Sequence, residues 1–97
     1  MKTMPGVHRN TDARSCGAET TVSLQSSVYA NDKLVAVHGD PNSHGGGGLI
    51  ASGSTVFVED KLIIIEGDSA NPDAFCPILP IHCNPSAVGK SDTVFIY

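Results

Sequence analysis

The segment VYANDKLVAVHGD, residues 28–40, decides the fold because it recurs as VFVEDKLIIIEGD, residues 56–68, at an offset of 28 residues. Six of the thirteen aligned positions are identical, and most of the others exchange Tyr for Phe or Val for Ile. A fixed internal offset is typical of a chain that repeats one supersecondary unit. The sequence therefore predicts a fold built from copies of this segment.

A third, incomplete copy follows. Asp92-Thr93-Val94-Phe95-Ile96 repeats Ser54-Thr55-Val56-Phe57-Val58 at an offset of 38 residues, so the third copy carries a ten-residue insertion. The insertion falls near residues 69–81 and contains three prolines, which favour an irregular loop. We predict one domain over residues 1–97, with repeats at about 12–39, 40–67 and 68–97.

Each full copy has the pattern of a β-hairpin. An apolar run is followed by a two-residue turn, Asn31-Asp32 or Glu59-Asp60, and then by a second apolar run. Asp12, Asp40 and Asp68 recur at the copy boundaries, where such residues cap turns through side-chain hydrogen bonds. No window of helical length has a sustained 3.6-residue period. We expect an all-β protein of three hairpin repeats, related by a pseudo-threefold axis, with almost no helix.

Metal-ligating residues recur in register with the copies. Cys16, His44 and His82 each lie twelve residues before one of the aligned valines of the repeat, and all three are good zinc ligands. Three equivalent positions around a shared axis can converge on one ion. The register therefore predicts one structural metal ion, Zn²⁺ or alternatively iron, since these ligands suit both metals. The glycines that follow His44, Gly45 to Gly48, are expected to form a tight turn.

A structural zinc site normally has a fourth protein ligand. Cys76, Cys83 and His8 are the candidates, and the sequence alone leaves them open. Cys76 is favoured because it lies six residues before His82 in the insertion, where the chain can fold back over the ion. His8 is the alternative, and Cys83 would tend to point away from an ion that its neighbour His82 faces.

Composition excludes several classes of function. The net charge is −4 and the six basic residues are scattered, whereas nucleic-acid binding needs concentrated positive charge. No apolar run approaches the roughly 20 residues needed to span a bilayer, and the N-terminus lacks the apolar segment of a secretory signal. Synthesis in the cytoplasm is expected, where three cysteines favour metal ligation or burial over a disulfide framework.

The motifs Gly39-Asp40-Pro41-Asn42-Ser43-His44-Gly45-Gly46, Ser52-Gly53-Ser54-Thr55-Val56, Gly67-Asp68 and Cys76-Pro77 resemble the PAAR-repeat family over about residues 5–97. The Pro-Ala-Ala-Arg tetrapeptide itself is replaced by apolar residues at 34–37 and 62–65. The resemblance implies a small cone of three β-rich repeats with a metal ion, held by histidines and cysteine, near its point. It also implies a non-enzymatic role as the tip of the central spike of a contractile injection machine.

The resemblance further implies the partners and the location of the protein. The partner would be a homotrimeric β-helical spike, capped by one tip chain per trimer, with transient contact to the target envelope. The chain would assemble into the tail baseplate of a virion or into a secretion-machine spike. Because the sequence stops at Tyr97 within the third copy, a stand-alone tip is expected rather than an effector carrier. The alternatives are a small zinc-dependent hydrolase, disfavoured because no obvious general acid or base stands near the ligands, and a free-standing metal-binding adaptor.

Overall fold

Two of the three predicted hairpins are present in the computed structural model, which describes residues 6–52, 56–76, 78, 80–83 and 85–95. Strand β1 (Tyr29–Ala30) pairs with β2 (Lys33–Leu34), and β3 (Phe57–Val58) pairs with β4 (Lys61–Leu62), both antiparallel. The registers are equivalent, with Tyr29 opposite Leu34 and Phe57 opposite Leu62.

The hairpin turns have the conformation that two-residue loops favour. Asn31 and Asp32 have φ of 54° and 66°, and Glu59 and Asp60 have φ of 49° and 68°. Positive φ at both central residues matches the right-handed twist of the flanking strands. The two copies adopt the same turn although Glu59 tolerates this conformation less well than Asn31 does.

The third copy pairs with the opposite end of the chain. Phe95 forms an antiparallel bridge with Gly6, and the Val7 N–H donates to the Val94 carbonyl at 3.0 Å. The same bond recurs in the other copies, from Val35 to Val28 and from Ile63 to Val56, also at 3.0 Å. The N-terminal segment therefore supplies the strand that follows the hairpin turn in copies one and two. Ile96 of the third copy, and Gly53, Ser54, Thr55 and Pro77 of the earlier motifs, lie outside the described residues.

Three buried residues spaced 28 apart join these segments in a closed ring of backbone hydrogen bonds. The bonds run from His8 N–H to the Ile64 carbonyl, from Ile64 to Ala36, and from Ala36 back to His8, at 3.0, 3.0 and 2.9 Å. All three residues are fully buried. The ring shows that equivalent positions of the sequence occupy equivalent positions in the backbone network.

The recurring aspartates cap turns, as predicted. The carboxylates of Asp12, Asp40 and Asp68 each accept a hydrogen bond from the backbone N–H three residues earlier, at 2.9, 2.8 and 3.0 Å. Gly39 and Gly67 precede two of them with φ of 96° and 93°. Thr11 precedes the third with φ of 70°, a left-handed conformation that a β-branched residue adopts at a cost.

The described residues form an all-β structure with no α-helix, in which short strands and isolated bridges surround two apolar clusters. The first cluster, near the hairpins, contains Val7, Ala30, Val35, Val37, Val58 and Ile63. The second contains Ala36, Leu49, Ile64, Ala70 and Ala87. No helix in the described part of the chain is long and apolar enough to cross a membrane.

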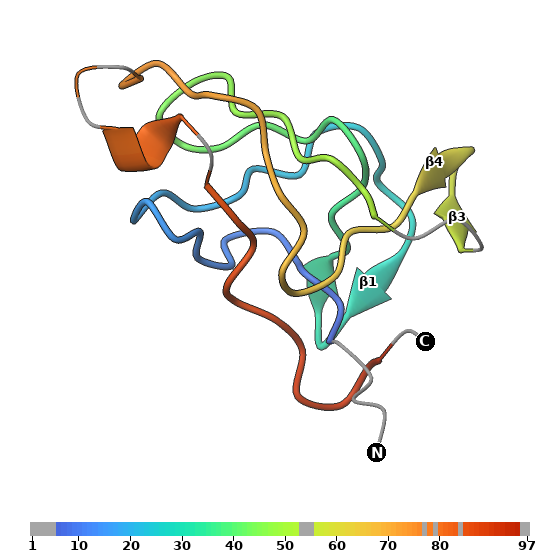
Figure 1. Cartoon of the computed structure of the whole chain (residues 1–97). Helices are drawn as coiled ribbons and strands as arrows, with labels where there is room; N and C mark the ends of the chain where they lie inside the picture. Colours follow the sequence, from blue (N-terminus) through green and yellow to red (C-terminus); the bar gives the residue numbers. More distant parts are fainter. Residues whose placement is uncertain (1–5, 53–55, 77, 79, 84, 96–97) are drawn as a thin grey trace.

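The insertion is irregular, as expected, apart from one turn of 3-10 helix, η1 (Pro80–His82). Figure 1 shows η1 at one end of the molecule, with the hairpins and the C-terminal segment toward the other. We call these the cluster end, which holds the candidate metal site, and the hairpin end.

Candidate metal centre

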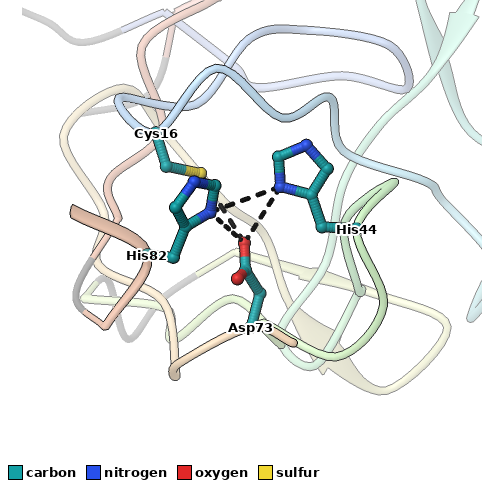
Figure 2. A group of neighbouring side chains, drawn as sticks. All are labelled: Cys16, His44, Asp73 and His82. Carbon is teal, nitrogen blue, oxygen red and sulfur yellow. Dashed lines mark hydrogen bonds and ion pairs between the residues drawn. The ribbon is translucent and has the colours of Figure 1, made fainter. Parts of the chain in front are cut away.

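Four potential ligands converge at the cluster end: Cys16, His44, Asp73 and His82 (Figure 2). One donor atom from each lies within 4.8 Å of every other. Cys16 and His44 lie far in sequence from each other and from the segment that holds Asp73 and His82, so only the folded state assembles the four side chains. The structure thus brings together the three residues predicted from register and adds a carboxylate.

The spacing of the donors suits a small tetrahedral ion. The Nδ1 atoms of His44 and His82 are 3.3 Å apart, and the His44 Nδ1 lies 3.3 Å from the Asp73 Oδ2. In a tetrahedral site with Zn–N bonds of about 2.0–2.1 Å, two nitrogen ligands are about 3.3–3.4 Å apart. The Cys16 Sγ, which forms longer bonds to zinc, is 3.8 Å from the same carboxylate oxygen. The set could therefore hold one Zn²⁺ ion with modest adjustment.

Tight turns position Cys16 and His44. Cys16 is followed by Gly17 with φ of 90°, and His44 by Gly45 and Gly46 with φ of 94° and 72°. These conformations favour glycine, so the prediction of a tight turn after His44 is confirmed. The Asn42 side chain accepts a hydrogen bond from the His44 backbone N–H at 2.9 Å, which fixes the start of that turn.

Asp73 is held in place on both carboxylate oxygens. Its Oδ1 accepts from the Phe75 N–H at 2.9 Å, and its Oδ2 accepts from the Asn42 amide at 2.9 Å and lies 2.8 Å from the His82 Nδ1. Desolvation alone would raise the pKa of this buried carboxyl, but these hydrogen bonds outweigh it and hold the pKa well below its ordinary value. Asp73 is therefore an anion at neutral pH, directed at both imidazoles.

Phe75 covers one side of the cluster. Its ring lies 4.5 Å from the His44 ring and 5.2 Å from the His82 ring, centroid to centroid. An aromatic cover limits the access of water and strengthens electrostatic interactions beneath it.

The structure contradicts the prediction that Cys76 is the fourth ligand. The Cys76 sulfur is bonded to that of Cys83 in a disulfide, so neither atom is a thiolate free to bind metal. Asp73 occupies the place expected for Cys76. The expectation that the cysteines avoid disulfides is wrong for this pair, because the turn at η1 brings the two residues to a Cα separation of 4.9 Å. Cys16 is a free cysteine.

His8, the alternative fourth ligand, belongs to a different network. Arg14 Nε donates to the Thr20 hydroxyl oxygen at 2.9 Å, which leaves the hydroxyl proton for the His8 Nε2 at 2.6 Å. The His8 Nδ1 then donates to the Gly89 carbonyl at 2.6 Å. Burial lowers the pKa of His8, so the imidazole is neutral. Both ring nitrogens are engaged, and His8 is not a member of the metal cluster.

Arg14 links this network to the candidate metal centre. Its buried guanidinium donates to the backbone carbonyls of Gly47 and Asp40, and desolvation lowers its pKa to about 10, while Cys16 and Asp73 act in the opposite direction. The side chain remains charged at neutral pH and lies near Cys16 and Asp73 of the cluster.

Asp73 escaped the sequence analysis for an identifiable reason. It lies in the insertion of the third copy, where the repeat has no counterpart, so register cannot single it out. The available indication was its position nine residues before His82 in a proline-rich loop, and Cys76 has the same kind of position.

The chain matches no protein-family model, and no curated protein is significantly similar to it.

Proposed function

We propose that this chain is a structural protein, a metal-pinned tip that caps the homotrimeric β-helical spike of a contractile tail or injection machine. In this proposal three hairpin units surround a pseudo-threefold axis and form a small cone. The third unit is assembled from both ends of the chain. One metal ion, Zn²⁺ by its ligand chemistry, ties the three units together near the point.

The observation that carries the proposal is the closed ring of hydrogen bonds among His8, Ala36 and Ile64. A ring of equivalent residues in a single chain is what three units around one axis would produce. A single chain of this kind can present three similar edges to a partner with true threefold symmetry, and one copy then suffices to close a trimer.

The composition of the candidate site supports a structural ion rather than a catalytic one. Cys16, His44, Asp73 and His82 supply four protein donors. Four donors would complete a tetrahedron around one ion and leave no position for a reactive water. The resemblance to the PAAR-repeat family adds the kind of machine, a virion tail baseplate or a secretion spike. It also supplies the role of sharpening that spike for transient contact with the target envelope.

The test is reconstitution with the β-helical spike protein encoded in the same genome. Native mass spectrometry of the mixture should give a complex of one chain with one spike trimer, and metal analysis should give one ion per chain. A zinc-loaded chain that fails to bind the trimer would contradict the proposed function. Cobalt-substituted protein with an exchangeable water on the metal would contradict the closed structural site.

A further inference from the structure

Three exposed aromatic side chains occupy the same position in the three copies. Tyr29 and Phe57 are each 59% exposed, and Phe95 is 41% exposed. Each directly follows one of the aligned valines, Val28, Val56 and Val94. Large aromatic residues are costly to leave in water and are enriched at the centres of protein interfaces.

The three positions are equivalent in the backbone hydrogen-bond network as well as in the sequence. Each aligned valine carbonyl accepts the same hydrogen bond at 3.0 Å from the strand beside it. The residues after Tyr29 and Phe57 are the buried Ala30 and Val58. Because side chains alternate along a strand, Tyr29 and Phe57 face away from the core, and Phe95 is exposed at the equivalent position of the repeat.

Apolar side chains next to these aromatics are exposed as well. Val28 and Val94 beside them are 39% and 38% exposed. Of the ten large apolar side chains exposed in the described part of the chain, five therefore lie in these equivalent segments. We call Val28, Tyr29, Phe57, Val94 and Phe95 the aromatic face.

We propose that the aromatic face is the docking surface of this chain, and that Tyr29, Phe57 and Phe95 each contact one subunit of a homotrimer at the same site. A homotrimer offers the same apolar environment three times around one axis and so matches three equivalent aromatic side chains of one chain. The occupant is therefore the apolar end of a symmetric trimer. This inference rests on the proposed function and deepens it. It assigns the contact residues and predicts that they contribute equally to binding of the trimer.

The experiment measures binding of single variants to the purified homotrimeric β-helical spike protein of the same genome. Tyr29→Glu, Phe57→Glu and Phe95→Glu each place a charge at one aromatic position. Ile78→Glu is the matched control, because Ile78 is 84% exposed and lies in the insertion at the cluster end. Unchanged metal content and melting temperature establish that each variant is folded.

Each aromatic variant should weaken binding at least about tenfold, as expected for an interface anchor, and by a similar factor at the three positions. The Ile78 variant should bind as the unchanged chain does. If the unchanged chain binds and the three aromatic variants bind equally well, the docking surface is wrong while the proposed function stands. A large loss at only one position would overturn the equal three-point contact.

Two further outcomes would also overturn the inference. If the unchanged chain binds no trimer, the proposed function fails together with the docking surface. If the chain instead self-associates at micromolar concentration, and the three aromatic variants abolish that association, the aromatic face joins copies of this chain.

Discussion

The hairpin end and the cluster end are stabilised in different ways. At the hairpin end, equivalent residues of each copy make the same backbone hydrogen bonds around apolar side chains such as Val35 and Ile63. At the cluster end, polar groups from all three copies meet, and no two copies contribute the same set. The difference shows that a repeated sequence can supply the scaffold while an unrepeated insertion completes the site.

The largest effect should come from removing the metal. We expect chelation, or the variant His82→Ala, to abolish most of the folding free energy. Apparent binding free energies of structural zinc are about 10–16 kcal/mol, and the whole stability of a small domain is about 5–15 kcal/mol. Thermal unfolding with and without a chelator measures the loss.

The matched control for that experiment is His38→Ala, because His38 is an exposed histidine outside the cluster. This variant should keep both metal and stability. A chelated chain that unfolds at the same temperature as the untreated chain would show that the ion is dispensable.

The next largest effect should come from the apolar ring position Ile64. Ile64 is fully buried in the second apolar cluster, so Ile64→Ala removes buried methyl groups and leaves a cavity. The expected loss is about 2–5 kcal/mol in the free energy of unfolding. Denaturant unfolding of the metal-loaded protein measures it. Metal stoichiometry should be unchanged. A variant that loses its metal without unfolding would show that metal binding at the cluster end depends on apolar packing at Ile64.

A smaller effect should appear on acidification, through His8. Burial lowers the pKa of His8 below its ordinary value of 6.5, so the folded state binds fewer protons than the unfolded state. The contribution of neutral His8 to the free energy of unfolding is therefore fully present above pH 6.5 and declines as the pH falls through that value. One such group changes stability by at most about 1.4 kcal/mol per pH unit.

The pH experiment needs a comparison that cancels proton competition at the metal ligands. His8→Gln keeps a polar side chain at this position of the backbone hydrogen-bond ring, and glutamine does not titrate. With the metal saturated, the difference in the free energy of unfolding between the unchanged chain and His8→Gln should change between pH 7.5 and 5. Parallel curves over that range would exclude His8 as the source. Of the charged groups near His8, Asp12 acts to raise its pKa, and Arg9 and Arg14 act to lower it.

The smallest effect should come from Thr11→Gly. Thr11 has φ of 70° where the other copies have Gly39 and Gly67, and nothing lies within 4 Å of a Cβ built on Gly67. Left-handed backbone costs a non-glycine residue about 1–2 kcal/mol, part of which the greater chain entropy of glycine offsets. We expect stabilisation by up to about 1 kcal/mol, and Gly67→Ala should destabilise. Thermal unfolding measures both, and stabilisation by Gly67→Ala would contradict the equivalence of the two turns.

Much of the hairpin end could be predicted from the sequence. The offset of 28 residues identified both hairpins and their turns, because local patterning and turn chemistry agree there. The pairing of Gly6 with Phe95 was not predicted, since the incomplete third copy gives no indication that the opposite chain end completes it. Closure of this kind depends on tertiary contacts rather than on local sequence.

The cluster end could be predicted only where it follows the repeat. Cys16, His44 and His82 are in register and converge in the structure. The choice of Cys76 rested on loop length and general ligand preference, which do not determine where an irregular loop directs its side chains. The disulfide with Cys83 and the placement of Asp73 depend on the irregular path of the insertion, which no periodic pattern encodes.

X-ray absorption at the zinc edge of the metal-loaded chain tests most directly whether Cys16, His44, Asp73 and His82 pin one ion. The account predicts one ion per chain with two imidazole nitrogens, one carboxylate oxygen and one sulfur. The spectrum should be the same for Cys76→Ser and should lose its sulfur contribution in Cys16→Ser. Two sulfur ligands, or a spectrum altered by Cys76→Ser, would contradict the account and restore Cys76 as a ligand.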